Sequence, residues 1–353
     1  MTYRITLLPG DGIGPEITAV ARAVLEHVAA LEGFRIEFAT CAFGGASIDE
    51  FGEPLTEATL KTCQASDAIF LGAVGGPKWD RADARPEAGL LALRKALGVY
   101  ANLRPAAVHP ALAGKSPLRP DLVAGTDVLI VRELTGGIYF GQRERSADSA
   151  SDKCTYSRGE IERVARIAFE QARLRRGKLT SVDKANVLET SRLWRDVVTE
   201  MGARDFPDIE LDHMYVDAAA MHMLRAPASF DVIVTENMFG DILSDEASML
   251  PGSIGLLGSA SLGENKPGLF EPIHGSAPDI AGQDKANPFG AIEAAAQLLE
   301  SLDETGAAGR IRSAINTMHE AGEWTGDLGG SLSCSQAGVK LVERLEAEAV
   351  AAE

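Results

Sequence analysis

The sequence predicts an α/β protein with two domains, and three observations support this. At 353 residues the chain exceeds the length at which single hydrophobic cores usually stop growing. Short apolar, β-branched stretches alternate with segments of helical period, which is typical of a sheet covered by helices. A predicted strand at 230–235 leads into a predicted helix that Pro251 and Gly252 end, and this helix carries a candidate metal site.

Composition and charge argue against several classes of protein. A hydrophobic fraction of 45% and a charged fraction of 24% are typical of a soluble globular protein. The net charge of -17 argues against nucleic acid and lipid surfaces as partners, because both favour basic patches. We find neither a signal-peptide pattern nor an apolar run of membrane-spanning length. The cysteines lack zinc or redox spacing, so we expect free thiols and a cytoplasmic protein; they are Cys41, Cys63, Cys154 and Cys334.

The first predicted strand, 2–8, runs into a glycine-rich turn and a helix that reaches about residue 31. The glycines of this turn, Gly10, Gly12 and Gly14, have the spacing G-x-G-x-G. A dinucleotide-binding Rossmann turn has G-x-G-x-x-G and an acid that closes the second strand. We therefore expect a tight strand-to-helix turn here, although its backbone N–H groups could still line a site.

Strands at 34–40 and 68–74 continue the alternation, and a short helix follows at 87–94. Four residues of this helix lie at i, i+3, i+4 and i+7, and so share one face: Glu87, Leu90, Leu91 and Arg94. An acid and a base on either side of two leucines suit a pocket for a partly apolar anion. Packing against the core is the alternative, and the pattern taken alone favours it.

The predicted strands 100–105 and 127–134 each carry an arginine near one end, Arg104 and Arg132. Open α/β sheets place ligand-binding groups at strand ends, although a single arginine is more often a solvated surface residue. In 135–141 glycines flank Tyr139, which suits a phenol exposed to a cleft; a packed strand tyrosine is the alternative. Residues 142–157 are polar without clear period, and we expect a loop or a projecting arm.

Further along, a basic helix at 158–176 stops at Gly177, and the strand 179–182 ends next to Lys184. Most lysines are solvated, so Lys184 is only a candidate for a cleft. After another helix, the strand 209–216 leads to Asp217 at the start of the next helix.

Asp241 and Asp245 lie four residues apart in the helix after strand 230–235, so their carboxylates project from one face. Two anionic oxygen ligands one turn apart suit a hard divalent cation such as Mg²⁺ or Mn²⁺. An acidic turn that complements the helix dipole is the alternative.

The last part of the chain combines a predicted strand, a long loop and three helices. The strand is 254–261 and the helices are 288–302, 307–320 and 333–347. The loop, 270–280, contains one histidine and two acids, and loops of this length without regular structure are usually functional.

Taken together, the motifs resemble the β-decarboxylating dehydrogenases of the isocitrate and isopropylmalate family nearly from end to end. Each motif alone is weakly specific, whereas the set is highly specific. The motifs are GDGIGPE (10–16), EAGLLALRK (87–95), YANLRP (100–105), VRELTGGIYFG (131–141), DKANVL (183–188), NMFGDILSDEASMLPGSIGLLGSASLG (237–263) and FEPIHGSAPDIAG (270–282).

This resemblance implies an α/β fold with a large mixed sheet flanked by helices, and not a Rossmann fold. It implies a first domain, 1–99 plus 252–353, that holds the cofactor loop. The inserted domain, 100–251, would carry the metal site, the arm and the dimer contacts. Relatives are homodimers with shared active sites, so Lys184 and Asp217 would enter the site of the partner subunit.

The resemblance also implies the reaction, which is NAD-dependent oxidative decarboxylation of 3-isopropylmalate to 4-methyl-2-oxopentanoate and CO₂ in leucine biosynthesis. Lys184 would be the base and Tyr139 the acid, both with lowered pKa values. Asp217, Asp241 and Asp245 would hold Mg²⁺ or Mn²⁺. The substrate-binding residues would be Glu87, Leu90, Leu91, Arg94, Arg104, Arg132, Val187 and Asp217, with bidentate arginines on the substrate carboxylates.

In this family the adenosine half of NAD binds to the loop 274–287. The residues carried over are His274, Gly275, Ser276, Ala277, Pro278, Asp279, Ile280 and Asn287. Asp279 can accept a hydrogen bond from the 2′-hydroxyl of NAD and repels the 2′-phosphate of NADP. NADP-dependent relatives tend to have Lys-Tyr where this chain has Asp279 and Ile280.

Two other functions are compatible with the same motifs. One is a sister activity on isocitrate, homoisocitrate or D-malate/tartrate; isocitrate enzymes carry a Ser/Asn pair where residues 87–91 offer an apolar wall. A wall of this kind discriminates between alkyl groups by only about 1–3 kcal/mol per methylene. The other is a catalytically silent regulatory subunit, which would have lost part of the Tyr, Lys and Asp set; the set is complete here.

Overall fold

The structure is a computed structural model that describes residues 1–79, 84–265 and 267–352. The packing of the chain divides it into two compact units. Unit one consists of Met1–Val99 and Ser253–Glu353, and unit two is the continuous segment Tyr100–Gly252. The chain therefore leaves unit one once, builds unit two, and returns.

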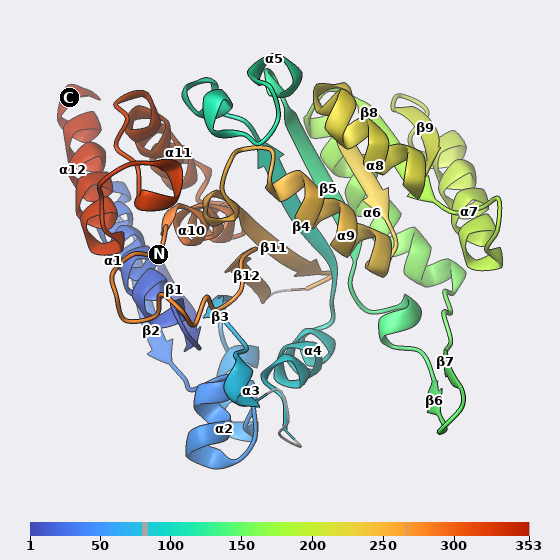
Figure 1. Cartoon of the computed structure of the whole chain (residues 1–353). Coiled ribbons are helices and arrows are strands. Elements are labelled where there is room, and N and C mark those ends of the chain that lie inside the picture. Colours follow the sequence, from blue (N-terminus) through green and yellow to red (C-terminus); the bar gives the residue numbers. More distant parts are fainter. Residues whose placement is uncertain (80–83, 266, 353) are drawn as a thin grey trace. The chain divides into compact units, whose positions relative to one another are not determined.

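The strands of unit one form a mixed arrangement in the order β2-β1-β3-β12-β11 (Figure 1). Their bounds are β1 Thr2–Gly10, β2 Arg35–Thr40, β3 Ala68–Ala73, β11 Gly258–Gly263 and β12 Gly268–Pro272. Strand β1 pairs in parallel with β2 and β3, β12 pairs in parallel with β3, and β11 is antiparallel to β12. Strand β3 is buried along its whole length, as its apolar sequence requires.

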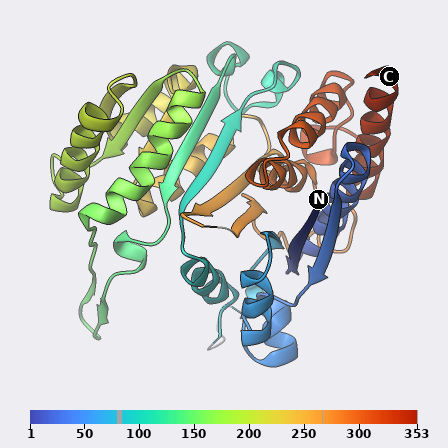
Figure 2. The same cartoon turned by 180° about the vertical axis from the view of Figure 1, so that it is seen from behind.

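Helices cover this part of the sheet on both faces. Their bounds are α1 Gly14–Glu32, α2 Gly45–Phe51, α3 Glu57–Gln64, α4 Pro86–Leu97, α10 Phe289–Ser301, α11 Thr305–Glu320 and α12 Cys334–Ala352. Helices α1 and α12 lie side by side (Figures 1 and 2). A core cluster joins Leu8, Ile69 and Leu269 of the strands to Cys63 of α3 and Leu93 of α4.

The glycine-rich turn between β1 and α1 is tight, as predicted. Gly10 and Gly12 have positive φ angles of 71° and 58°, which favour glycine. A Cβ atom on Gly12 would lie 1.9 Å from the carbonyl oxygen of Ser276, so no other residue fits there. The carboxylate of Asp11 accepts backbone N–H groups of Gly45 and Gly75, among others, which fixes the turn.

Unit two repeats the mixed α/β pattern in the strand order β4-β5-β10-β8-β9. Its elements are β4 Val99–Ala107, α5 Pro120–Val123, β5 Asp127–Glu133, α6 Arg158–Leu174, β8 Lys178–Asp183, α7 Glu189–Asp205, β9 Glu210–Tyr215, α8 Val216–Arg225, β10 Val232–Thr235 and α9 Asn237–Ser248. Strand β4 is antiparallel to β5, and the other pairs are parallel. Helices α6 and α7 cover one face, and α8 and α9 the other (Figures 1 and 2). A mixed sheet flanked by helices is thus confirmed.

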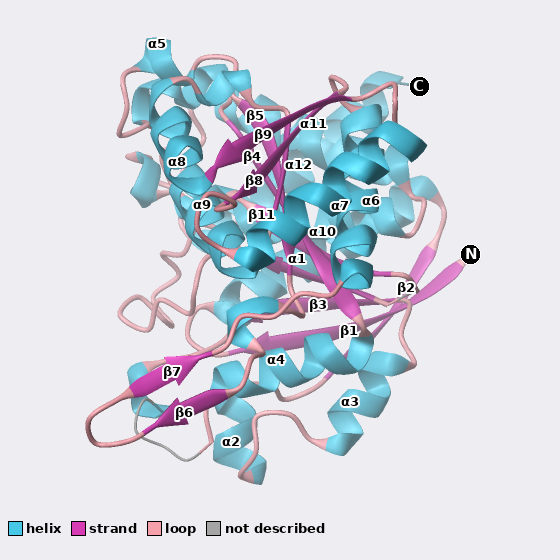
Figure 3. Cartoon of the chain, turned by 90° about the vertical axis from the view of Figure 1, so that its right-hand side faces the viewer, coloured by secondary structure: helices cyan, strands magenta, loops and turns pink. Residues whose placement is uncertain are grey.

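The predicted arm at 142–157 contains a small hairpin of β6 Arg143–Arg145 and β7 Ala150–Asp152. Both strands are exposed along their whole length. In Figure 3 the hairpin extends away from the helices of its unit, which fits the expectation of a projecting arm.

Two details near the return to unit one differ from the prediction. Residues Ile254–Leu256 form a 3₁₀ turn in place of a strand, because the hydroxyl of Ser253 accepts the N–H of Gly255 (3.0 Å). Strand β12 takes up the first residues of the predicted loop 270–280. Its partners β3 and β11 lie elsewhere in the sequence, so local pattern alone did not indicate it.

Two further predictions can be compared with the structure. Over the described residues, no helix is long and apolar enough to cross a membrane. All four cysteines are free thiols, as expected.

Candidate active site

The main candidate site lies in unit two, where two arginines meet two aspartates. Arg132, near the end of β5, donates from Nη1 to the carboxylate of Asp241. Arg104 of β4 donates from Nη1 to Asp245 at 3.1 Å. Because α9 presents both aspartates on one face, the four predicted residues lie together. Arg104, Arg132, Asp241 and Asp245 are called the arginine–carboxylate cluster below.

The arginines of this cluster, Arg132 buried and Arg104 half-buried, are held by neutral oxygens. Arg132 is 4% exposed, and its Nε and Nη2 donate to Oδ1 of Asn237 at 3.1 and 2.9 Å. Nε of Arg104 donates to Asn102 at 2.7 Å, and its Nη1 to the hydroxyl of Ser244 at 2.8 Å. The carboxylates are more open, since the side chain of Asp245 is 63% exposed. Fixed cations behind accessible carboxylates can exchange those carboxylates for the carboxylates of a ligand.

Sequence reasoning missed the three residues that hold the arginines. Asn102 lies two residues before Arg104, hence on the same side of β4, and Ser244 precedes Asp245. Asn237 is the first residue of α9. A search for amide and hydroxyl groups one or two positions from each candidate would have found Asn102 and Ser244, but not Asn237.

Tyr139 belongs to the same site. It ends the 3₁₀ turn Gly137–Tyr139, and its hydroxyl donates to Asp241 at 3.0 Å. The guanidinium carbon of Arg132 lies 5.8 Å from the centre of its ring. Burial and the negative charge of Asp241 raise the pKa of Tyr139. The expected lowering of this pKa is therefore wrong for this arrangement, in which Arg132 opposes the increase only partly.

Lys184 and Asp217 form a separate pair. Lys184 follows the end of β8, and its ammonium group contacts the carboxylate of Asp217 in the first turn of α8. This contact lowers the pKa of Asp217. Val187 lies nearby in sequence and is 62% exposed. Within the described residues, no hydrogen bond or ion pair joins Lys184 to the arginine–carboxylate cluster, and Asp217 does not gather with Asp241 and Asp245.

The donor set fits a hard divalent cation in part. Asp241 and Asp245 offer carboxylate oxygens one helical turn apart, which Mg²⁺ and Mn²⁺ favour. These oxygens now contact arginines, so a cation has to displace the guanidinium groups, or share the carboxylates with them. Within the described residues of this chain, Asp217, the third predicted ligand, does not lie with Asp241 and Asp245 but pairs with Lys184.

In unit one, the predicted face of α4 has a mixed environment. Arg94 is 8% exposed and pairs with Glu271 of β12 at 2.6 Å, a partner that sequence reasoning did not identify. Leu90 and Leu91 are half-buried, and Leu90 packs against the core cluster that includes Leu93. Glu87 is exposed. Leu90 thus makes the core contacts that the alternative interpretation expects.

The loop 274–287, called the cofactor loop below, follows β12. Ser276 is buried, and Ala277 has an unusual φ of 38°. Asn287 donates to Asp327 at 2.9 Å, and its Oδ1 accepts the N–H of Phe289. Burial lowers the pKa of His274, which favours the neutral imidazole. In contrast, Gly275, Pro278 and Asp279 are exposed, with Ile280 half-buried.

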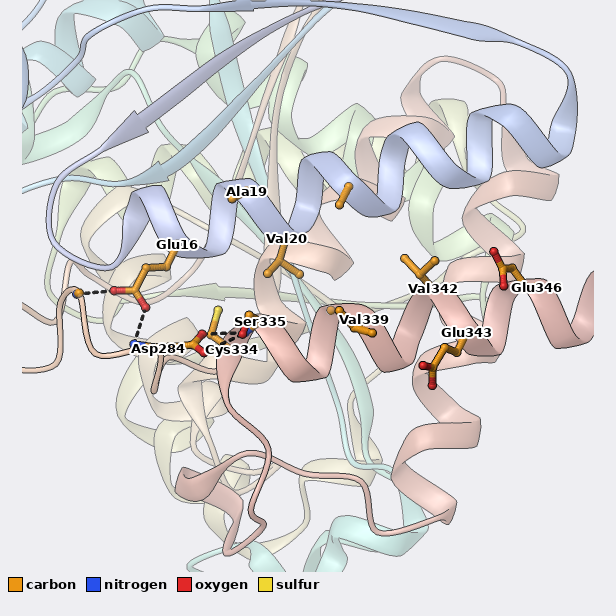
Figure 4. Close-up of a pocket in the computed structure, with 13 residues that line it drawn as sticks. Glu16, Ala19, Val20, Asp284, Cys334, Ser335, Val339, Val342, Glu343 and Glu346 are labelled. Carbon is orange, nitrogen blue, oxygen red and sulfur yellow. Dashed lines mark hydrogen bonds between the residues drawn. The ribbon is translucent and has the colours of Figure 1, made fainter.

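The far end of the cofactor loop is tied to two helices (Figure 4). Glu16 of α1 accepts the backbone N–H groups of Gly282 and Asp284. The carboxylate of Asp284 accepts the N–H and the hydroxyl of Ser335 in α12, at 2.7 and 2.6 Å. With Cys334, these acids form a group called the loop-anchoring cluster: Glu16, Asp284 and Cys334. It borders a cavity of about 740 Å³ between α1 and α12.

The loop-anchoring cluster is poorly suited to a metal ion. Its carboxylates already accept hydrogen bonds from N–H and O–H groups, and these bonds would have to break for the same oxygens to bind a cation. Burial and the charges of Asp284 and Glu16 raise the pKa of the Cys334 thiol to about 12, so the thiolate ligand is scarce at neutral pH. We interpret the cluster as structural support for the cofactor loop.

Known proteins share this sequence and fold. A family model described as isocitrate/isopropylmalate dehydrogenase matches residues 4–341. A curated 3-isopropylmalate dehydrogenase from Salinibacter ruber is 59% identical, over 93% of this chain and 90% of that protein. One from Gloeobacter violaceus is 54% identical over 98% of both. The crystal structure of an isocitrate dehydrogenase from Methylococcus capsulatus has a TM-score of 0.88 and 38% identity, covering 97% of this chain and 99% of that one.

Proposed function

The chain belongs to the isocitrate/isopropylmalate dehydrogenase family, and we propose that it oxidises and decarboxylates 3-isopropylmalate with NAD, as a step of leucine biosynthesis. The product would be 4-methyl-2-oxopentanoate together with CO₂. Among observations of the structure itself, the arginine–carboxylate cluster next to Tyr139 carries the proposal most directly. It combines fixed cations for a dicarboxylate, oxygen ligands for a metal and a protonated phenol.

Substrate binding is assigned first to Arg104 and Arg132. Their guanidinium groups are held by Asn102 and Asn237, so they are preorganised to bind planar carboxylates. We assign Arg94 to the same substrate by family resemblance, with Glu87, Leu90, Leu91 and Val187 around the alkyl group. The half-buried Leu91 and the open part of Leu90 would contact the isopropyl group, since both are apolar.

The metal is assigned to Asp241 and Asp245, with Asp217 of the partner subunit as the third carboxylate. When bound, Mg²⁺ or Mn²⁺ would favour the alkoxide at C2 and stabilise the enolate left by decarboxylation. Arg104 and Arg132 would then turn from the aspartates to the substrate. This exchange conserves charge, because two carboxylates are released to the cation while two others arrive.

Proton transfer is assigned to Tyr139 and Lys184. The raised pKa of Tyr139 keeps its hydroxyl protonated near neutral pH, which suits a general acid that protonates the carbon after CO₂ leaves. Lys184, now paired with Asp217, would accept the proton of the C2 hydroxyl, directly or through a water molecule.

NAD is assigned to the cofactor loop, with Asp279 as the residue that selects it over NADP. Asp279 is exposed, so its carboxylate can reach the 2′-hydroxyl of an adenosine ribose. The same negative charge would repel a 2′-phosphate. His274 through Ile280, together with Asn287, are the contacts we propose for the adenosine half.

A homodimer is proposed from an apolar surface on α8 and α9. Both helices lie on the same face of the sheet of unit two and expose large apolar side chains: Met221 (64%), Leu224 (47%), Ile242 (58%) and Met249 at the end of α9 (46%). Apolar patches of this kind usually mark an interface. Lys184 and Asp217 lie at the base of α8, where a two-fold partner could bring them to the other subunit's arginine–carboxylate cluster. We assign the protein to the cytoplasm, where its free thiols stay reduced.

A substrate panel tests the proposed function. 3-Isopropylmalate, D-malate, tartrate, homoisocitrate and isocitrate are each supplied with NAD or NADP plus Mg²⁺, and reduced cofactor is followed by its absorbance. We expect the highest kcat/KM for 3-isopropylmalate with NAD. A higher value for isocitrate, homoisocitrate or D-malate would replace the proposed function by that sister activity.

A further inference from the structure

Tyr156 is a buried tyrosine outside the predicted site residues, and it packs against the turn that carries Tyr139. It lies in the last residues of the arm, just before α6, is 6% exposed and meets Trp194 edge to face at 5.7 Å. A Cβ atom on Gly136 or Gly137 would come within 2.6 or 2.4 Å of the Tyr156 side chain. The two glycines before Tyr139 are therefore explained by the close approach of this second tyrosine, and not by exposure of Tyr139.

The hydroxyl of Tyr156 is a junction of hydrogen bonds. It accepts the backbone N–H of Asn237 at 3.0 Å. It lies 3.3 Å from a carboxyl oxygen of Glu133 and 3.3 Å from one of Glu236. Glu133 is fully buried and Glu236 is 8% exposed, so neither carboxyl group can rely on water.

Asn237 links this junction to the arginine–carboxylate cluster. Its side-chain oxygen accepts two N–H groups of Arg132, and its Nδ2 donates to the carbonyl of Gly136 at 3.2 Å. Moving Asn237 would therefore shift Arg132 and the turn before Tyr139 together.

We propose that Tyr156 is a positioning residue, whose hydroxyl fixes Asn237 and thereby orients Arg132 toward the substrate and Tyr139 toward the reacting carbon. This inference rests on the proposed function, because the roles of Arg132 and Tyr139 belong to it. Within the described residues, the Tyr156 hydroxyl has no hydrogen bond to Tyr139 or to any member of the arginine–carboxylate cluster, so it acts through Asn237.

The hydrogen-bond donors around the Tyr156 hydroxyl also indicate which of the two carboxyl groups is protonated, and the structure assigns the proton to Glu236. Tyr156 has one hydroxyl proton and two carboxyl neighbours, so it can donate to only one of them. Glu133 already accepts three hydrogen bonds, from the N–H and the O–H of Thr135 and from the N–H of Gly136. A group that accepts this many hydrogen bonds is an ionised carboxylate. Among the described residues, the other oxygen of Glu236 accepts a single donor, the N–H of Phe239. Glu236 is thus the protonated partner that donates to Tyr156, and Tyr156 donates to Glu133.

The charges that face the junction act in different directions. Arg163 of α6 lies 3.7 Å from Glu133 and favours its ionised form. Arg132 of β5 faces Glu236 and favours ionisation there, which opposes the assignment but is a smaller effect than burial. The ionised Glu133 would repel a second carboxylate on the same phenol, which favours the protonated form of Glu236, and the thiol of Cys154 also faces this carboxyl group. Burial raises the pKa of Glu236, as a protonated carboxyl requires. Burial also raises the pKa of Glu133, which its N–H and O–H donors and Arg163 oppose.

The first test removes the Tyr156 hydroxyl with Tyr156→Phe. We expect KM for the preferred dicarboxylate to rise about tenfold and kcat to fall about tenfold, with KM for NAD unchanged, since small misplacements of reacting groups are costly. The matched control is Tyr3→Phe, which removes a buried hydroxyl bonded to Glu304 (2.7 Å) in unit one. Both variants should lose similar thermal stability, but only Tyr156→Phe should change KM for the dicarboxylate.

The second test compares two carboxyl replacements. Glu236→Gln keeps an acceptor for Phe239 and a donor for Tyr156, so we expect a loss of less than about threefold in kcat/KM. In Glu133→Gln the amide NH2 group faces N–H donors and has no acceptor. We expect kcat/KM to fall by at least about thirtyfold, because an unpaired buried donor is costly. Equal losses would overturn the proton assignment. Where Tyr156→Phe does not fold, this pair carries the test of the junction, and wild-type kinetics in both would overturn its role.

The outcomes separate this inference from the proposed function. All tests use whichever substrate of the panel the wild-type enzyme prefers, because each of them has carboxylates for Arg132 to bind. Preference for a substrate other than 3-isopropylmalate would contradict the proposed function alone. Tyr156→Phe kinetics equal to those of Tyr3→Phe would contradict the positioning role alone.

Discussion

The arginine–carboxylate cluster of unit two and the loop-anchoring cluster of unit one both gather acidic side chains at helices, but their carboxylates have different partners. In unit two the partners are side-chain guanidinium groups, held from behind by Asn102 and Asn237. In unit one they are mainly backbone N–H groups, which fold with the chain and cannot leave. A group of acidic side chains can therefore bind a ligand when its hydrogen-bond partners can be exchanged. Acidic side chains that are merely close together do not form a binding site.

The largest effect should come from Asp241→Asn, because this change removes charge where the partners are exchangeable. We expect kcat to fall by more than about a hundredfold, since even supporting residues of metal sites cost about 10–100-fold. Calorimetry should show weaker binding of Mn²⁺. The control is Asp284→Asn in the loop-anchoring cluster, which should leave the affinity for Mn²⁺ unchanged. Full wild-type activity in a chelated, metal-free buffer would contradict the metal assignment.

The next effect tests whether the unit-two site is completed by a second subunit. Tyr139→Phe and Lys184→Ala homodimers should each be nearly inactive. In a mixed dimer one site collects both changes and the other collects neither. Random exchange at equal amounts makes about half the dimers mixed, so activity should recover to about a quarter of wild type. Heterodimers confirmed by tags but without recovered activity would mean that each subunit builds its own site.

A smaller effect is expected at the exposed part of the cofactor loop. Asp279→Lys combined with Ile280→Tyr should shift the ratio of kcat/KM values toward NADP by about 10–100-fold, because a repulsive charge becomes attractive. The control is Asp284→Asn, which changes an acid four residues further along the same loop and should leave the ratio of the kcat/KM values unchanged. A wild-type enzyme that already prefers NADP would show that Asp279 does not select the cofactor.

The smallest effect is predicted for Asp284→Ala, which removes the carboxylate from the start of α12. Loss of such a helix-start acceptor costs about 1 kcal/mol of stability. Hydrogen bonds from Ser333 and Ser335 lower the pKa of Asp284 in the folded protein. Its contribution to stability is therefore fully present above the unfolded pKa of about 3.9 and decreases as pH falls from there through the lower folded pKa. Denaturant titrations of wild type and variant at pH 7 and pH 3 check this, and a difference that grows at pH 3 would contradict the sign.

Much of the fold and half of the site followed from local sequence pattern. Helix α9 with its two aspartates and the arginines of β4 and β5 were found because each depends on spacing or on position at a strand end. Tyr139 was singled out by its flanking glycines, although the structure explains Gly136 and Gly137 by the approach of Tyr156. Strand β12 was missed because its identity depends on β3, about two hundred residues away. The pairing of Lys184 with Asp217, and of Arg94 with Glu271, likewise depends on contacts between distant segments.

The raised pKa of Tyr139 shows a different limit. The family resemblance implied arginines and a cation around Tyr139, and hence a lowered pKa. The folded chain places Asp241 next to its hydroxyl and half-buries the side chain, and each of these effects on the pKa exceeds that of Arg132. The balance of opposing charges at a few ångströms cannot be read from spacing. The same holds for Tyr156, whose importance follows only from its approach to two glycines.

The discontinuous make-up of unit one has a consequence for synthesis on the ribosome. Unit two is one uninterrupted segment, so it can fold as soon as residue 252 has emerged. Strand β3 of unit one, in contrast, gains its neighbour β12 only when residues 268–272 appear, and α1 gains α12 only at the end of translation. Until then β3 has an unpaired apolar edge. The growing chain therefore carries a finished second unit while the first, although begun earlier, still needs protection from aggregation.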